Sequence, residues 1–436
     1  MIERLTLREE AGSVGKATLA RLADREKVHT LVSEMPPPVS LGLKRHWSPI
    51  SLALGDVGHA ITFGYLHQLY PSEGWDRVAH VYMKEATAGL NEIPTVPLGL
   101  FGGLTGLTSA ARYLSMDGKR YQKALAVLDG RLFALTRSWL SSLPPDGGVP
   151  VSTYDLISGL TGIGRYLLAA AISSTEAEQL AFDLFRLMIR WSLIPETTGF
   201  YTPPDLVPEF EMRRDPTLGS GYINCGLAHG VPGPLALMAL AYRSGIQIPG
   251  LTDAIYTLAY WLKGTLLETP SGPDIPYHVS LTLDRVQPGV TRTAWCYGNP
   301  GAARALQLAG NALHDAVLQT ESLRLMRGVA IRLPQVRNIP APTFCHGMAG
   351  VLQVLLRYLD DSSQPDALLV SFAEDILQAI LTRYDPLATT GFQDLEPGNG
   401  LVANPGLLEG ASGVALVLLG ASSGVETTWD THFLLS

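Results

Sequence analysis

Residues 344–360 read FCHGMAGVLQVLLRYLD, and they combine a short glycine motif with a long apolar run. Gly347 and Gly350 form the motif G-x-x-G, and the apolar residues between Val351 and Leu359 occupy nearly every side of a helix. A helix that is apolar all round is buried within its protein. Glycine suits the turn ahead of it, because glycine allows positive φ and a close approach of neighbouring backbones. This stretch therefore predicts a glycine turn that leads into a buried helix.

The same motif, followed by an apolar run, recurs along the whole chain. The first glycines of its seven copies are Gly55, Gly103, Gly159, Gly230, Gly298, Gly347 and Gly410. Amphipathic segments lie between the motifs, such as 121–135, whose leucines fall on one stripe at helical spacing. Each repeat therefore predicts a helical hairpin with one buried helix and one outer amphipathic helix, and the expected fold class is all-α.

The first and last repeats are as apolar as the middle ones, which bears on how seven hairpins assemble. The end repeats of an open solenoid are more polar than its middle repeats, whereas the runs after Gly58 and Gly413 are both apolar. We therefore expect a closed α/α toroid, which is a double-layered barrel with all seven glycine turns around one end.

The expected domain organisation is an N-terminal helical segment over residues 1–50 and a seven-repeat toroid domain over residues 51–436. Two repeats are longer than the others, with the extra residues at 197–222 and 268–292. Both stretches are poor in helical periodicity, and the second alternates like a short strand. We expect them to form loops or small β excursions over the mouth of the barrel.

The composition narrows the class of protein. The chain has 436 residues, of which 46% are hydrophobic and 17% charged, so it buries enough surface to fold and is not a disordered chain. Its net charge is −8 and it has no long Lys/Arg cluster, so no nucleic-acid partner is expected. The sequence contains no apolar run of about 18 residues, so no transmembrane segment is expected. Three cysteines are too few for a disulfide framework and indicate a reducing compartment.

Polar residues precede the glycine turns of repeats four, five and six. These residues are His229, the pair Cys296-Tyr297 and the pair Cys345-His346. If the turns meet at one end of a barrel, these side chains converge on one site. Two thiolates and one imidazole suit Zn²⁺ and leave its fourth tetrahedral position open, as in catalytic zinc sites. The alternative is that the cysteines are ordinary small buried residues.

Three segments resemble the signature motifs of the lanthionine synthetase C-like family, the lanthipeptide cyclases. They are CGLAHGVPG (225–233), WCYGNPG (295–301) and FCHGMAG (344–350), and YDLISGLTGIGRYLL (154–168) resembles the third repeat of that family. The resemblance implies an α/α toroid of seven hairpins, a single zinc ion and the closure of thioether rings. It places the zinc ligands at Cys296, Cys345 and His346 and the acid/base histidine at His229. It places further active-site residues at Asp155, Arg292 and Tyr297.

The chemistry that the resemblance implies is the addition of a cysteine thiol to dehydroalanine or dehydrobutyrine. The thiol must react as a thiolate, although its free pKa is about 8.5, and zinc binding deprotonates a thiol. The addition yields an enolate that must be protonated at Cα, for which a histidine is suited. Asp155 is expected to orient His229, and Arg292 to stabilise the developing negative charge.

Structural roles are the alternatives for several of these residues. Tyr297 would then only line the wall of the site, Asp155 would cap a helix, and Arg292 would be an exposed loop charge. Cys225 is expected to be a buried thiol rather than a ligand. Glu409 precedes the seventh glycine turn, and we assign it no role from the sequence.

The main functional hypothesis is a stand-alone, zinc-dependent lanthipeptide cyclase. Its expected partners are a dehydrated precursor peptide with a leader, a separate dehydratase and an export transporter. Its expected location is cytoplasmic, with possible membrane association through a biosynthetic complex. Two alternatives stay open: glutathione transfer to dehydroamino acids, and a non-catalytic zinc scaffold that holds a biosynthetic complex together.

Overall fold

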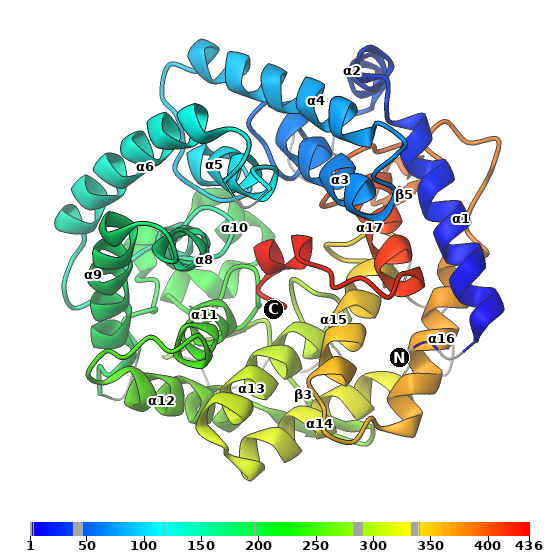
Figure 1. The fold of residues 1–436 in the computed structure, drawn as a ribbon. Coiled ribbons are helices and arrows are strands. Elements are labelled where there is room, and N and C mark those ends of the chain that lie inside the picture. The colour runs from blue at the N-terminus through cyan, green and yellow to red at the C-terminus, as the bar shows by residue number, and fades with distance from the viewer. Residues whose placement is uncertain are drawn as a thin grey trace. The chain divides into compact units, whose positions relative to one another are not determined.

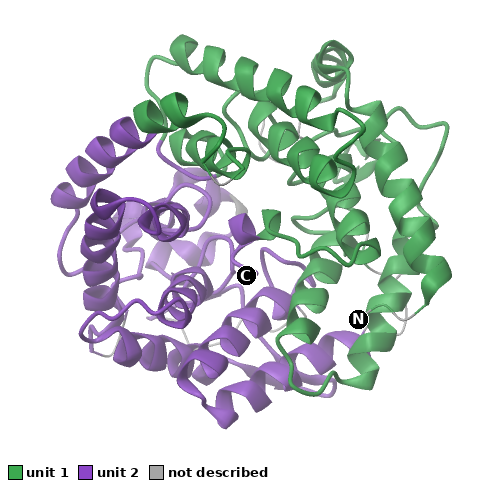
Figure 2. Ribbon diagram, viewed as in Figure 1, with its two compact units in different colours: residues 1–97, 101–128, 333–430 green, residues 98–100, 129–332, 431–436 purple. Residues whose placement is uncertain are grey.

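The computed structural model describes residues 2, 4–37, 47–116, 118–195, 198–281, 291–332, 339 and 341–436. The described chain is mainly α-helical, with three two-stranded antiparallel ribbons (Figure 1). It divides into two compact units (Figure 2). Unit 1 comprises residues 1–97, 101–128 and 333–430, and unit 2 comprises residues 98–100, 129–332 and 431–436.

In unit 1 each glycine turn leads into a buried helix, and in two repeats the following, more exposed helix packs against it. The buried helix α3 (Asp56–Leu69) packs against α4 (Trp75–Gly89), and α15 (Met348–Asp360) packs against α16 (Ala367–Leu381). The other buried helices are α5 (Leu104–Tyr113) and α17 (Ala411–Ser422). Contacts link these buried helices in the order α5, α3, α17, α15. After α5 the chain continues in α6 (Gln122–Ser142).

The N-terminal helix α1 (Leu5–Arg21) packs against α17, the buried helix of the last repeat. The two helices approach closely at Gly15, where an added Cβ would lie 3.1 Å from the carbonyl oxygen of Ala415. Leu7 and Leu19 of α1 are both buried, and each buried leucine stabilises the fold by about 1.5–3 kcal/mol. The seventh repeat therefore obtains its outer helix from the other end of the sequence.

The second N-terminal helix, α2 (Arg25–Glu34), is tied to the first glycine turn. Asp56, the first residue of α3, is fully buried and accepts two hydrogen bonds from the Arg25 guanidinium, at 2.6 and 3.0 Å. Its carboxylate also accepts one from the Trp47 indole at 3.2 Å. A buried carboxylate is stable only when it is paired and hydrogen-bonded, so these donors hold the N-terminal segment at the turn.

Unit 2 contains three hairpins of the same kind. Buried α8 (Leu160–Ala171), α11 (Pro232–Arg243) and α13 (Asn299–Leu313) pack against α9 (Thr175–Ser192), α12 (Leu251–Gly264) and α14 (Ala316–Arg332), respectively. Contacts link α8 to α11 and α11 to α13. The predicted pattern of a glycine turn, a buried helix and an outer helix is confirmed in these repeats.

The two longer stretches form small irregular excursions in unit 2. The first contains the short helix α10 (Glu209–Arg214), and the second contains β2 (Leu267–Thr269), which pairs with β3 (Gly272–Asp274). A second ribbon joins the second stretch to the residues just after the first, because β1 (Ile223–Asn224) pairs with β4 (His278–Val279). Residues 196–197 and 282–290 lie outside the described residues.

The glycines of the repeat motif allow close backbone contacts at the turns. The second glycine of the motif lies against the carbonyl oxygen of the residue six positions earlier. An added Cβ would lie 2.1–2.4 Å from that oxygen at Gly58, Gly162, Gly301 and Gly413. The first glycine of the fifth repeat, Gly298, has φ +95°, and a Cβ there would lie 1.6 Å from the carbonyl oxygen of Arg292. Any larger residue at these positions would force the turn and its helix apart.

Backbone hydrogen bonds join one glycine turn to the next within each unit. In unit 2, Leu156 N–H donates to Ala228 C=O at 3.0 Å, and Ala228 N–H donates to Cys296 C=O at 3.3 Å. In unit 1, Cys345 N–H donates to Leu408 C=O at 2.8 Å, and Leu408 N–H donates to Ala53 C=O at 3.2 Å. These bonds use the residues just ahead of the glycines, so they bring the polar side chains at these positions together.

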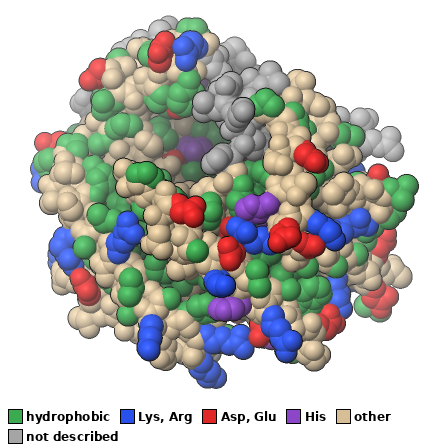
Figure 3. Space-filling view, turned by 90° about the horizontal axis from the view of Figure 1, so that it is seen from above, with side chains coloured by type: hydrophobic (Ala, Val, Ile, Leu, Met, Phe, Trp, Pro, Cys, Tyr) green, Lys and Arg blue, Asp and Glu red, His purple; other side chains and the backbone are tan. Residues whose placement is uncertain are grey.

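Two further features concern the surface charges and the apolar content of the helices. On the face that Figure 3 shows, acidic and basic side chains are intermixed with apolar ones. Among the described residues, no helix has both the length and the apolar content needed to cross a membrane.

Candidate active site and metal-binding residues

In unit 2, Asp155 is held in place by the turn that starts α8. It follows the short helix α7 (Val151–Tyr154) and is almost completely buried. Its Oδ1 accepts hydrogen bonds from the backbone N–H groups of Ser158 at 2.7 Å and Gly159 at 2.9 Å. Its Oδ2 lies 2.6 Å from Nδ1 of His229. The turn therefore aims one carboxylate oxygen at the histidine ring.

The Asp155 carboxylate orients the imidazole of His229 and raises its pKa. A carboxylate only accepts hydrogen bonds, so Nδ1 carries the proton of this contact and Nε2 is the nitrogen left for other groups. Burial opposes the protonated form, but the hydrogen bond and the negative charge of Asp155 outweigh it and raise the pKa of His229. The side chain of His229 remains 38% exposed. A partly exposed histidine with a raised pKa is suited to proton transfer.

Tyr297 lies next to His229 in unit 2. Its ring centroid is 6.0 Å from that of His229, with an angle of 30° between the planes. Asn224 Nδ2 donates to the Tyr297 hydroxyl at 2.9 Å, and the ring packs over Gly226, where a Cβ would lie 2.6 Å from it. Burial raises the pKa of Tyr297, so the hydroxyl stays protonated. It can therefore donate a hydrogen bond beside the imidazole.

Arg292 and Cys296 lie on the segment that carries Tyr297. Arg292 has an exposed side chain, and its backbone N–H donates to the Tyr277 hydroxyl at 2.7 Å. Cys296 is buried, and its carbonyl accepts the hydrogen bond from Ala228 described above. The backbone of unit 2 thus holds Cys296 and Tyr297 beside the turn of His229, while the guanidinium of Arg292 faces solvent.

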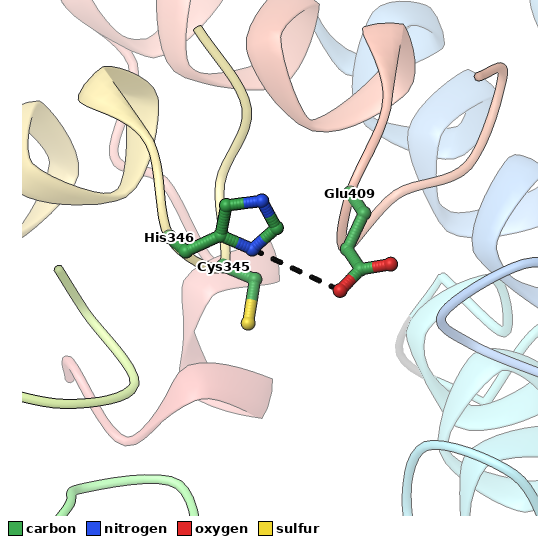
Figure 4. A group of neighbouring side chains, drawn as sticks. All are labelled: Cys345, His346 and Glu409. Atoms are coloured by element: carbon green, nitrogen blue, oxygen red, sulfur yellow. Dashed lines mark ion pairs between the residues drawn. The ribbon is translucent and has the colours of Figure 1, made fainter. Parts of the chain in front are cut away.

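In unit 1, Cys345, His346 and Glu409 form a group of potential metal ligands (Figure 4). One ligand atom from each side chain lies within 4.8 Å of the others. His346 Nδ1 is 3.8 Å from a carboxylate oxygen of Glu409. Zn²⁺ is bound in proteins by thiolate, imidazole and carboxylate groups, so the donor set in unit 1 fits this ion. Sequence reasoning noticed Glu409 by its position but assigned it no role.

A second carboxylate, that of Asp394, lies on the other side of the His346 ring. Its Oδ1 is 3.7 Å from His346 Nε2. Asp394 begins β5 (Asp394–Glu396), which pairs with β6 (Gly400–Val402). Sequence reasoning missed this residue, because it lies outside the glycine repeat. The nearest signal is the turn sequence PGNG at 397–400, which marks a hairpin but not the side chain it buries.

Cys225, the third cysteine, is a buried thiol in the structure. Burial raises its pKa, and its sulfur lies 3.8 Å from the carbonyl oxygen of Ile223. A neutral buried thiol behaves as a small apolar residue. Cys225 is thus a buried thiol, as expected from the sequence, and its lack of a ligand role stays a prediction.

The sequence model of the family described as "Lanthionine synthetase C-like protein" matches residues 46–434, so the chain belongs to this family. Among curated proteins, the chain is 22% identical to the nisin biosynthesis protein NisC of Lactococcus lactis subsp. lactis over 399 residues, which cover 88% of each protein. Among solved structures, it matches nisin cyclase with a TM-score of 0.74 and 19% identity, covering 94% of this chain and 97% of the other. The predicted fold class, an all-α toroid of helical hairpins, is confirmed by this match.

Proposed function

We propose that the protein is a zinc-dependent lanthipeptide cyclase, which closes thioether rings in a dehydrated precursor peptide. The observation that carries the proposal is the Asp155–His229 pair, whose 2.6 Å contact leaves Nε2 of a raised-pKa histidine available. Membership of the lanthionine synthetase C-like family supplies the reaction class. The names of the two matched proteins, a nisin biosynthesis protein and a nisin cyclase, also support a cyclase reaction.

The proposed ligands of one zinc ion are Cys296, Cys345 and His346. The arrangement of Cys345 and His346 in unit 1 supports two of them. The third, Cys296, rests on the WCYG motif and on the family resemblance. Zinc bound there would hold the attacking thiol as a thiolate near neutral pH.

The proposed task of His229 is to protonate the product. Attack of the cysteine sulfur on Cβ of the dehydroamino acid forms a C–S bond and moves the C=C electrons toward the carbonyl, giving an enolate. The protonated Nε2 of His229 then donates a proton to Cα. The thiol has lost one proton and Cα has gained one, so ring closure leaves the mass unchanged. Asp155 keeps the ring oriented and favours its protonated form.

Tyr297 and Arg292 are proposed to assist at the carbonyl oxygen, where negative charge develops. The Tyr297 hydroxyl supports this role because it is kept protonated and lies beside His229. Arg292 is always charged, and its exposed side chain is free to turn toward a bound peptide. Its assignment rests on the family resemblance.

The proposed substrate is a peptide in which a preceding dehydration has converted serine or threonine into dehydroamino acids. A separate dehydratase would supply it, and an export transporter would take the cyclised peptide away. We propose that the cyclase acts in the cytoplasm, where cysteine thiols remain reduced.

The test is incubation of the protein with a dehydrated peptide that contains cysteine, with glutathione present and with or without a chelator. Thiol alkylation followed by mass spectrometry then reports the product. We expect the free thiol to disappear with no change in mass, and the chelator to prevent this. Addition of a glutathione mass would indicate glutathione transfer instead. Unchanged peptide with zinc-loaded protein would indicate a non-catalytic scaffold and contradict the proposal.

A further inference from the structure

His346 has a carboxylate on each side of its ring, and the two differ in environment. Asp394 Oδ1 lies 3.7 Å from Nε2, and Glu409 Oε1 lies 3.8 Å from Nδ1. The side chain of Asp394 is 1% exposed, whereas that of Glu409 is 48% exposed. Only one of the two carboxylates is therefore built into the interior of unit 1.

The hairpin formed by β5 and β6 explains why Asp394 points inward. Asp394 pairs with Val402, and both are buried, whereas the next pair, Leu395 with Leu401, is exposed. Side chains alternate between the two faces of a strand, so the hairpin presents one face to the interior and the other to solvent. The backbone N–H of Leu395 donates to Asp394 Oδ1 at 2.9 Å, which fixes the carboxylate.

A buried carboxylate needs donors, and His346 Nε2–H is a suitable one. An ionised carboxylate is costly to bury unless hydrogen bonds and charges compensate. The separation of 3.7 Å is longer than a hydrogen bond, so donation from Nε2–H requires the imidazole to move toward Asp394. A neutral imidazole carries one proton, so a proton held at Nε2 leaves the lone pair at Nδ1.

Nδ1 is the nitrogen that faces the other ligand groups. In Figure 4 the contact to Glu409 leaves from Nδ1, on the side of the ring where the Cys345 sulfur lies. A metal ligand whose second nitrogen donates to a carboxylate is held in one tautomer and one orientation, and it becomes a more basic ligand.

We propose that Asp394 is a positioning residue that holds His346 as the Nε2–H tautomer and directs Nδ1 toward the metal. This inference rests on the proposed function, because it presupposes that His346 is a zinc ligand. It adds a residue outside the repeat motifs to the machinery of the site.

The first test is zinc affinity, measured by competition with a chromophoric chelator. Asp394→Asn keeps the size of the side chain but offers an amide that can donate to Nε2 and so favour the wrong tautomer. We expect its zinc affinity to fall about 10- to 100-fold, as for other carboxylate partners of metal-bound histidines. Glu396→Gln is the matched control, because it removes a carboxylate two residues further along β5. We expect it to bind zinc like the wild type.

The second test needs no change at Asp394 and so does not depend on the folding of that variant. The nitrogen NMR shifts of ¹⁵N-labelled histidine in the zinc-free wild type report which ring nitrogen is protonated, and the His346→Gln variant assigns the signal. We expect His346 to be protonated at Nε2. Protonation at Nδ1 would overturn the proposal.

The outcomes separate this inference from the proposed function. If the wild type binds no zinc, the zinc-dependent function fails and this inference fails with it. If the wild type binds zinc and a folded Asp394→Asn variant binds it equally well, only the role of Asp394 is wrong. Co²⁺ absorption of the substituted proteins supplies a readout without activity, and we expect Asp394→Asn to weaken the thiolate-to-cobalt band at equal Co²⁺ concentration.

Discussion

Two histidines that stand before glycine turns, one in each unit, differ in which ring nitrogen meets a carboxylate. His229 in unit 2 and His346 in unit 1 both stand directly before the first glycine of a repeat. Asp155 meets Nδ1 of His229 at 2.6 Å, whereas Asp394 lies 3.7 Å from Nε2 of His346. In the proposed mechanism, the first arrangement keeps Nε2 for a proton transfer and the second directs Nδ1 toward a metal. The same backbone position would then serve two chemical roles, according to where the neighbouring carboxylate comes from.

The strongest test of this difference is to remove each histidine in turn. In His229→Ala we expect the cyclisation rate to fall about 10²- to 10⁴-fold, because a general acid is lost, while the zinc content stays at the wild-type level. In His346→Ala we expect both zinc and cyclisation to be lost. Mass spectrometry of the peptide and elemental analysis of the protein measure the two quantities. A His229→Ala protein that closes rings at the normal rate would show that this histidine has no acid role.

The second test compares two cysteines with different surroundings. Cys345 lies among potential ligands, and Cys225 is a buried neutral thiol. We expect Cys345→Ala to weaken zinc binding at least on the order of 100-fold, because a thiolate ligand is lost. We expect Cys225→Ala to keep zinc and to cost only about 1–2 kcal/mol of unfolding free energy. Chelator competition and chemical denaturation give the two values, and equal zinc affinities in the two variants would count against Cys345 as a ligand.

The third test removes the charge that holds His229. The Asp155 carboxylate raises the pKa of His229, so Asp155→Asn should lower it. As the pH rises, His229 then loses its proton at a lower pH than in the wild type. The alkaline limb of the pH–rate profile should therefore move to lower pH. We also expect the rate at neutral pH to fall about 10- to 100-fold, as when partners of functional histidines are removed elsewhere. The control is Asp146→Asn, which removes an exposed carboxylate paired with Arg190 and should leave the pH–rate profile unchanged. A pH–rate profile that is also unchanged in Asp155→Asn would refute the role of the Asp155 carboxylate.

The smallest expected effect concerns the turn that carries Tyr297. In Gly298→Ala the new Cβ would lie 1.6 Å from the Arg292 carbonyl oxygen, at φ +95°. We expect a loss of about 1–3 kcal/mol in unfolding free energy, measured by denaturant titration. Gly130→Ala places a methyl group in open space on α6 and should stabilise the protein by up to about 1 kcal/mol. If both substitutions had the same effect, the turn would not depend on a close backbone approach.

Much of the fold could be predicted because its signals are local. The G-x-x-G motif, the apolar runs and the amphipathic stripes all lie within single repeats, and helical periodicity makes them visible in the sequence. The pairing of α1 with α17 was not predictable in this way. It joins residues about 400 positions apart in sequence, and no local pattern in residues 1–50 indicates its partner.

The candidate site could be predicted in part for the same reason. His229, Tyr297, Cys345 and His346 were found by aligning the repeats on their first glycines. Asp155 was indicated by the family resemblance. Asp394 has neither signal, because its proximity to His346 depends on a hairpin that forms outside the repeats. Glu409 was visible by position, but only its distance to His346 suggests a chemical role.

The sequence by itself determined the repeating hairpins, the close turns and the kind of residue that stands before each glycine. These features depend on backbone sterics and hydrophobic periodicity, which act over a few residues. The tertiary structure alone decided which carboxylate meets which ring nitrogen. That choice depends on packing between segments far apart in sequence, where the backbone hydrogen bonds between turns and the pleat of the β5–β6 hairpin set the direction of each side chain.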